Sequence, residues 1–246
     1  LLLTSVETAR RLGIPEDRWI FPLAGSQAND TFALSERDEL HRSPAIRLAG
    51  RRAFDIAGLS TDDVDLIDIY SCFPSAVQVA ATELGLALDD PARPLTVTGG
   101  LTFAGGPWCN YVTHSIATMA ERLRELPGAK GLITANGGYL TKHAFGIYGT
   151  EPPASGFRYE DVQAEVDQEP KTEAADGYSG AATVEAWTVN YGRDGSPFQT
   201  FVSVRTPAGA RTFAKIEDRD AAAQIADTDI AGASIEVAAD GSARLS

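Results

Sequence analysis

The sequence predicts an α/β protein followed by a small unit of antiparallel β-strands. Between residues 43 and 148, helical apolar spacing alternates with short apolar runs, which is typical of helices that cover a largely buried sheet. Beyond residue 180, single apolar and polar residues alternate instead, and Asp194-Gly195 marks a tight turn. An acidic, polar stretch that begins at Glu151 lies between the two patterns, so we expect a linker there.

The elements of the first part are indicated by apolar spacing and by end signals. Ser43-Pro44 is a typical helix start, apolar residues then recur at helical spacing, and Gly58 is a typical stop. We expect helices at residues 6–12, 43–57 and 74–84, a further helix that ends at Leu126, and strands at residues 1–5, 19–23, 64–70, 131–135 and 144–148.

The end of the chain is expected to form a small antiparallel β-barrel. Trp187, Val189 and Tyr191 alternate with polar residues, and three further strands are expected at 198–204, 211–216 and 234–237. Closure of these strands into a barrel leaves no unpaired edge. The expected boundaries are 18–150 for the α/β domain, 151–180 for the irregular linker and 181–246 for the barrel.

Composition excludes several classes of protein. The 246 residues are 43% apolar and 22% charged, which suffices for a sizeable core and argues against low-complexity disorder. No apolar run approaches the roughly 20 residues of a membrane span, and the N-terminus lacks the flanks of a signal peptide. The formal charge of −13 argues against nucleic acid as a partner.

The first residues indicate whether the chain was processed, and the cysteines indicate the compartment in which it is found. The chain starts at Leu1 without Met, in what resembles a buried strand, so we expect it to be truncated or processed. Cys72 and Cys109 lie in different local contexts that do not suggest a disulfide. A reducing cytoplasm is therefore the expected location.

Three segments lie at the ends of expected elements, and the second and third of them contain glycines. Their sequences are LIDIYSCF at 66–73, VTGGLTFAGGP at 97–107 and TANGGY at 134–139. These segments resemble the active-site loops of thiolases, most closely those of the sterol-carrier-type thiolases, and the resemblance spans residues 1–148. It implies a coenzyme A thioester as substrate or ligand, with no tightly bound cofactor and no metal.

In the first segment, the resemblance aligns residues 70–73 with the thiolase sequence His-Asp-Cys-Phe. Tyr70 and Ser71 replace the histidine and the acid, whereas Cys72 and Phe73 are retained. In sterol-carrier-type enzymes this cysteine is thought to act as acid and base, so the resemblance implies that role for Cys72. A second interpretation stays open, because free cysteine is among the most buried residue types and can simply pack in a core.

In the second segment, the resemblance aligns Gly105-Gly106-Pro107 with the thiolase sequence Gly-His-Pro. Gly106 takes the place of the histidine that helps to activate the nucleophile, and glycine offers neither a proton carrier nor a side-chain donor. The backbone N–H groups of Gly105 and Gly106 are left as candidate oxyanion donors. This departure argues against ordinary thiolase activity.

The third segment matches the terminal Cys-x-Gly loop of the family. Ala135 replaces the second catalytic cysteine, a loss that the sterol-carrier-type enzymes share and that Cys72 could offset. Asn136, Gly137 and Gly138 are candidate ligand contacts. For Asn136 a turn-forming role is the alternative.

Two histidines are candidates to replace the missing one. His143 lies beyond the third segment, on the opposite strand face from Lys142, and it either reaches the site or is buried and hydrogen-bonded. Asn110 and His114 lie in the first turns of the helix after Pro107, but helical spacing places His114 nearly opposite the apolar stripe, which favours solvent exposure. The arginines at 47, 51 and 52 share one helix face, which is either solvated or phosphate-binding.

The resemblance also implies a larger fold. Each half of a thiolase contributes a sheet and helices to five αβαβα layers, so residues 18–150 are expected to form the C-terminal half. Residues 1–17 are then the end of the other half, which carries the nucleophilic cysteine upstream of Leu1. The barrel resembles the additional OB-like domain of thiolase-like proteins type 1.

We therefore predict an acyltransferase-like protein of lipid or sterol metabolism with a degenerate active site, inactive as this fragment alone. The candidate catalytic residues are Cys72, Gly106 and His143, and the candidate substrate-binding residues are Tyr70, Ser71, Phe73, Gly105, Pro107, Asn110, His114, Asn136, Gly137 and Gly138. The alternative is an inactive thiolase fold that binds acyl-CoA or docks a partner through the barrel. A homo-oligomer or a partner protein is expected in either case, and an upstream nucleophilic cysteine would favour the enzyme.

Overall fold

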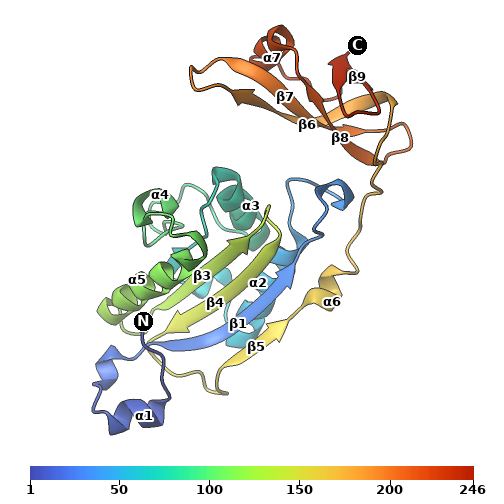
Figure 1. Cartoon of the computed structure of the whole chain (residues 1–246). Helices are drawn as coiled ribbons and strands as arrows, with labels where there is room; N and C mark the ends of the chain where they lie inside the picture. The colour runs from blue at the N-terminus through green and yellow to red at the C-terminus, as the bar shows by residue number, and fades with distance from the viewer. The chain divides into compact units, whose positions relative to one another are not determined.

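The computed structural model describes all 246 residues, which form two compact units (Figure 1). The first unit comprises Leu1–Asp30 and Glu39–Glu169, and the second comprises Thr31–Asp38 and Pro170–Ser246. A short segment from the N-terminal part of the chain therefore belongs to the second unit. No helix has both the length and the apolar composition to cross a membrane.

The first unit is built on a mixed five-stranded sheet with the strand order β2-β3-β4-β1-β5. Its strands are β1 (Phe21–Asn29), β2 (Leu66–Asp68), β3 (Lys130–Gly137), β4 (Lys142–Gly149) and β5 (Arg158–Asp161). The β3–β4 and β4–β1 pairs are antiparallel, whereas β2–β3 and β1–β5 are parallel. The sheet order brings β2 beside the β3–β4 hairpin, although about 60 residues separate them in the chain.

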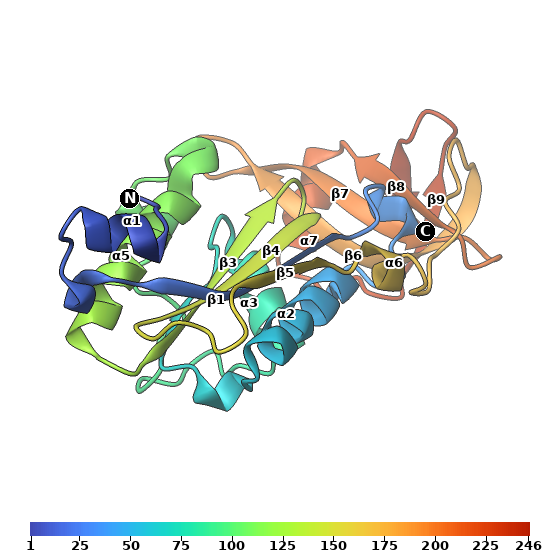
Figure 2. The same cartoon turned by 90° about the horizontal axis from the view of Figure 1, so that it is seen from below.

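Helices cover both faces of this sheet (Figure 1, Figure 2). Leu132 of β3 packs in the core with α2 (Pro44–Ala57) and α3 (Pro74–Leu84), whereas the next residue, Ile133, packs with α5 (Tyr111–Glu125). Successive strand residues point to opposite faces, so α5 lies on the other side of the sheet from α2 and α3. The predicted layered α/β class is confirmed for this unit.

The ends of α2 follow the predicted local signals. The Ser43 hydroxyl accepts a hydrogen bond from the Ile46 N–H at 3.1 Å, which satisfies one of the free donors at the helix start. Gly58 closes the helix with φ = +67°, a conformation that favours glycine. The other helices are α1 (Val6–Arg11), α4 (Leu101–Ala104), α6 (Gln163–Val166) and α7 (Arg219–Ala226), with 3₁₀ turns at Glu16–Arg18, Leu34–Glu36, Thr61–Asp63 and Trp108–Asn110.

Several expected elements differ from the structure. Residues 1–5 form no strand, and β1 continues six residues beyond the expected end at Leu23. Small residues of this extension, such as Ala24, Ser26 and Ala28, are buried against α2. The expected irregular linker at 151–180 contains β5 and α6. Strand β5 is mostly exposed and pairs only with β1, so it has no apolar alternation to reveal it.

The second unit contains an antiparallel five-stranded sheet with the order β10-β9-β6-β7-β8. Its strands are β6 (Gly180–Tyr191), β7 (Pro197–Arg205), β8 (Arg211–Ile216), β9 (Ser234–Val237) and β10 (Ala243–Leu245). Ile225 of α7 packs in the core formed by one face of the sheet. An isolated bridge joins Lys215 to Ser242, while closure into a barrel stays a prediction.

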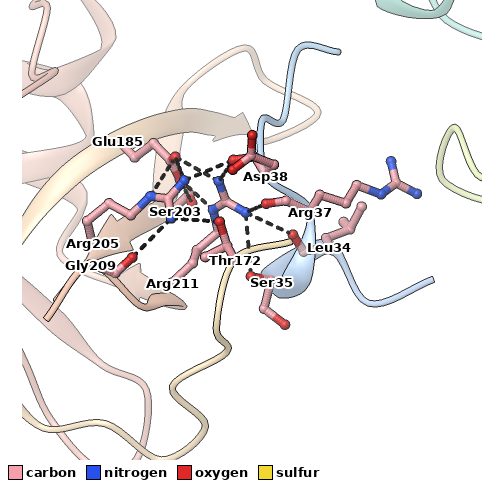
Figure 3. A network of polar contacts seen from close by, with 10 residues as sticks. All are labelled: Leu34, Ser35, Arg37, Asp38, Thr172, Glu185, Ser203, Arg205, Gly209 and Arg211. Carbon is pink, nitrogen blue, oxygen red and sulfur yellow. Dashed lines mark hydrogen bonds and ion pairs between the residues drawn. The ribbon is translucent and has the colours of Figure 1, made fainter. Parts of the chain in front are cut away.

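The segment 31–38 is bound to this second sheet by two arginines (Figure 3). Arg211, which is fully buried, donates to the Asp38 carbonyl at 2.9 Å and also to the Arg37 carbonyl. Arg205 donates to the same Asp38 carbonyl at 3.0 Å. Burial raises the pKa of the Glu185 carboxyl, but hydrogen bonds from Arg211, Ser203 and Arg205 outweigh burial and lower the pKa to about 2.

Candidate functional site

The first segment, residues 66–73, and the third segment, residues 134–139, meet at the end of β2. The Tyr70 N–H donates to Thr134 Oγ1 at 3.0 Å, which ties the residues after β2 to β3. Beyond this bond, Asn136 Nδ2 lies 3.4 Å from Cys72 Sγ in a hydrogen bond to the sulfur. Cys72 is exposed, so the interpretation of Cys72 as a buried packing residue is wrong for the described chain.

The second segment is joined to the first through Ser71. The Ser71 hydroxyl oxygen accepts a hydrogen bond from the Leu101 N–H at 3.1 Å, at the start of α4. Gly100 has φ = +82°, and a Cβ atom there would lie only 2.8 Å from Ser71 Oγ. Only glycine fits this position, because it tolerates both the backbone conformation and the close approach.

A buried carboxylate anchors the glycine loop to the sheet. Asp68, at the end of β2, is fully buried, and its Oδ1 accepts hydrogen bonds from Thr96 Oγ1 at 2.8 Å and Val97 N at 3.0 Å. Its Oδ2 accepts from the Tyr111 hydroxyl at 3.0 Å. Burial is the main reason that the pKa of Tyr111 is raised to about 12, so this hydroxyl remains a donor.

This anchor was not predicted from the sequence, although one signal was present. An aspartate inside the apolar run 66–69 needs partners when it is buried. Its partners are Thr96, Thr98 and Tyr111, and the Tyr111 ring also makes an edge contact with the Tyr70 ring, with centroids 5.3 Å apart. The first segment, the glycine loop and the start of α5 are therefore held by one polar cluster.

The two candidate oxyanion donors differ in their hydrogen bonds. The Gly105 N–H donates to the Leu101 carbonyl at 3.1 Å, so it reaches a ligand only if the α4 turn opens. The Gly106 N–H makes no hydrogen bond to the protein. Gly106 has φ = +49° and is exposed, as are its neighbours Trp108 and Asn110.

The third segment is part of the β3–β4 hairpin. Asn136 lies in β3 opposite His143 of β4, rather than in the turn, while Gly138 with φ = +66° lies in the turn itself. The Thr141 N–H closes this turn by donating to the Gly137 carbonyl at 3.1 Å. The side chain of Asn136 is therefore directed by strand pairing, and it is the direct link to Cys72.

His143 is buried beside a buried carboxylate, but its Nε2 atom has no hydrogen-bond partner in the protein. Its side chain is 2% exposed, and its Nε2 atom lies 3.3 Å from Asp30 Oδ2. Asp30 also accepts hydrogen bonds from the Ser43 hydroxyl and from the Ala45 N–H at 3.0 Å. His114 is exposed on α5, opposite the buried Met119, which agrees with its expected solvation.

The arginines of α2 are paired with carboxylates. Arg47 lies 2.8 Å from Glu169, Arg52 contacts Glu165 at 2.7 Å and also Glu160, and Arg51 lies 3.9 Å from Asp55. These acids neutralise the helix face that a phosphate would need. The solvated, ion-paired interpretation is therefore the better one for this face.

Comparison with protein families finds two models that match successive parts of the chain. The model described as thiolase C-terminal domain-like matches residues 26–150. The model described as the thiolase-like protein type 1 additional C-terminal domain matches residues 161–242. The second match supports the expected resemblance of the last part, and it begins within the segment that the sequence had suggested as a linker.

Known proteins resemble this chain over part of their length. An acetyl-CoA acetyltransferase of Methanothermobacter thermautotrophicus is 30% identical over 129 residues, which cover 47% of this chain and 33% of the relative. An acetyl-CoA acetyltransferase of Methanocaldococcus jannaschii is 29% identical over 85 residues, covering 35% of this chain and 21% of the relative. The chain thus spans a third or less of these curated relatives.

A solved structure resembles nearly the whole chain. The crystal structure of a monomeric SCP2-thiolase like protein type 1 from Mycobacterium smegmatis superposes with a TM-score of 0.88 and 36% sequence identity. The match covers 99% of this chain and 54% of the other one. Because that protein is described as monomeric, the expected homo-oligomer receives no support from it.

Proposed function

Because the chain belongs to the thiolase C-terminal domain-like family, we propose that it supplies the C-terminal part of a thiolase-type acyltransferase acting on acyl-CoA thioesters. The observation that carries this proposal is the hydrogen bond from Asn136 to Cys72, which brings two of the three thiolase-like loops together. Ser71 links the remaining loop, residues 97–107, to them. The loops that surround the thioester in the family are thus assembled here by named contacts.

In this proposal Cys72 is the acid and base, and it is exposed as that role requires. The free Gly106 N–H is the oxyanion donor. Asn136 is a ligand contact and donates a hydrogen bond to the sulfur. His143, which lies opposite Asn136 in the strand pairing, supports it in this role. The other lining residues are Tyr70, Ser71, Phe73, Gly105, Pro107, Asn110, His114, Gly137 and Gly138.

The site is proposed to be degenerate with respect to ordinary thiolases. Gly106 and Ala135 stand where the family has a histidine and a cysteine, so proton transfer depends on Cys72 alone. A substrate from lipid or sterol metabolism and a cytoplasmic location remain part of the proposal. The second unit, proposed to close as an OB-like barrel, is then a docking module for a partner protein.

A second candidate function is acyl-CoA binding without turnover. It is favoured by the loss of the histidine at Gly106, since glycine carries no proton. The test measures acyl-CoA binding by calorimetry and thiolysis of a 3-ketoacyl-CoA with the full-length protein. Binding with turnover supports the acyltransferase, binding without turnover supports the second candidate, and absence of binding contradicts both.

A further inference from the structure

A small pocket lies in the first unit beside the third segment, residues 134–139, between β3, β4 and the helices α2 and α3. Its apolar wall consists of Ile46, Ile69, Ala76, Ala80, Leu140 and Phe145. Its polar lining includes Tyr70, Thr134, Asn136 and His143. The pocket has room for about one water molecule.

Two buried polar atoms on the wall of this pocket have no hydrogen-bond partner in the protein. They are Asn136 Oδ1 and His143 Nε2. The two residues lie directly opposite each other in the β3–β4 pairing, so their side chains project from the same face of the sheet. Buried polar atoms are hydrogen-bonded in the great majority of cases, and an apolar occupant could not satisfy these two.

We infer that one water molecule binds here and joins His143 Nε2 to Asn136 Oδ1, in a hydrogen-bond chain that ends at the sulfur of Cys72. His143 donates to the water, the water donates to Asn136 Oδ1, and Asn136 Nδ2 donates to Cys72 Sγ. Every donor in this chain meets an acceptor. His143 is thus a positioning residue that acts on Cys72 through Asn136.

The carboxylate of Asp30 also lies close to His143 Nε2. Asp30 Oδ2 lies 3.3 Å from Nε2, and a hydrogen atom on Nε2 is compatible with this neighbour, whereas a lone pair there would face the carboxylate oxygen. The two atoms do not meet the geometry of a hydrogen bond, so the N–H remains available to the water. Ser43 and the Ala45 N–H hold Asp30 in place.

For Cys72, the consequence is that the Asn136 Nδ2 group is held as a hydrogen-bond donor to its sulfur. With Oδ1 held by the water, the amide of Asn136 cannot turn its oxygen toward Cys72. A donor at the sulfur stabilises the thiolate, which is the form that reacts with alkylating reagents. The use of this thiolate in catalysis rests on the proposed function, but its formation can be measured without any activity.

The test follows alkylation of Cys72 by iodoacetamide in the full-length protein, using mass spectrometry of the Cys72 peptide. We expect His143→Phe to slow alkylation by about 3- to 10-fold, because the series of hydrogen bonds from His143 to Cys72 loses its first donor. Asn136→Leu is expected to slow it at least as much and serves as the second variant if His143→Phe fails to fold. Phe145→Leu changes only the apolar wall of the same pocket and should stay within about twofold of the parent.

Crystallography supplies the second readout. A structure of the full-length protein should show a water within hydrogen-bond distance of both His143 Nε2 and Asn136 Oδ1. A folded His143→Phe variant that is alkylated at the parent rate, or a crystal structure with no water between His143 Nε2 and the Asn136 amide, overturns the inference. If acyl-CoA does not bind the parent but His143→Phe still slows alkylation, the proposed function fails and the hydrogen-bond chain stands.

Discussion

Arg211 and Glu185 form a two-point ion pair inside the second unit, with Arg211 Nε 2.6 Å from Glu185 Oε2 and Arg211 Nη2 2.8 Å from Oε1. The planar guanidinium matches the carboxylate with two parallel hydrogen bonds, and its remaining N–H groups reach the carbonyls of the segment 31–38 (Figure 3). This one side chain therefore attaches a loop of the first part of the sequence to a strand of the last.

Replacement of Arg211 is expected to destabilise the second unit strongly. Arg211→Met leaves the Glu185 carboxylate without its buried partner and the carbonyls of Arg37 and Asp38 with fewer donors, so we expect a loss of about 3–5 kcal/mol in the free energy of unfolding. Urea denaturation followed by circular dichroism measures it. The control is Arg193→Met at an exposed turn, for which a change below about 0.5 kcal/mol is expected. Equal stability of the two variants would contradict the structural role of Arg211.

The same ion pair predicts a dependence of stability on acidity. The pKa of Glu185 is lowered from 4.5 to about 2 in the folded protein, so the folded state favours the charged form. The resulting stabilisation is present above about pH 4.5 and is lost as the pH falls toward 2. Allowing for solvent screening of a partly exposed group, it amounts to about 1–3 kcal/mol. Urea titrations across this range should show the loss in the parent and a much smaller one in Glu185→Gln.

Local signals predicted some elements of the fold well and others poorly. Helix α2 was predicted because Ser43 and Gly58 mark its ends within the helix sequence itself. The end of β1 was missed because Ala24 and Ala28 are buried by elements that come later in the chain, including helix α2. Burial that depends on distant pairing leaves no periodic pattern in the segment that is buried.

The candidate site was likewise predicted in part from the sequence. The resemblance to thiolases identified the loops that contain Cys72 and Asn136, and the structure brings these two residues into contact. It did not identify the hydrogen bond between Tyr111 and Asp68, which joins residues that are 43 positions apart. A role that depends on a contact between residues distant in the sequence can be recognised only from the structure, even when each residue stands out in the sequence.

Substitution at Gly100 is expected to disturb the glycine loop more than substitution at Gly105. Both have a positive φ, but an added Cβ at Gly100 would lie 2.8 Å from Ser71 Oγ, whereas nothing lies within 4 Å at Gly105. Gly100→Ala should therefore combine backbone strain of about 1–3 kcal/mol with a displaced loop, and Gly105→Ala should show the strain alone. Calorimetry with acyl-CoA should then show weaker binding to Gly100→Ala than to Gly105→Ala. Equal affinities would show that the position of this loop does not matter for binding.

Alkylation of Cys72 is expected to be slowed by acyl-CoA. Cys72 is exposed and lies beside Asn136, where the proposed thioester would cover it. The measurement compares labelling rates with and without acyl-CoA in full-length protein shown to bind it, because labelling depends on access and on thiolate. Unchanged rates at Cys72 in the presence of bound ligand would place Cys72 outside the site. Cys109, also exposed, is labelled in the same samples and reports whether any protection extends to the start of α5.

Restoring the histidine at Gly106 tests the degenerate site most directly. An added Cβ at this position would come no closer than 4.0 Å to another atom, so space is available, although φ = +49° implies backbone strain of about 1–3 kcal/mol. In full-length protein that carries the upstream cysteine, we expect Gly106→His to create or raise thiolysis of a 3-ketoacyl-CoA. General acid and base assistance contributes about 10²–10⁴-fold, so even partial restoration is measurable.

Thermal unfolding must show that the variant is folded. A folded variant that binds acyl-CoA without any gain in thiolysis would mean that more than the histidine is missing, and acyl-CoA binding without turnover would then be the better proposal.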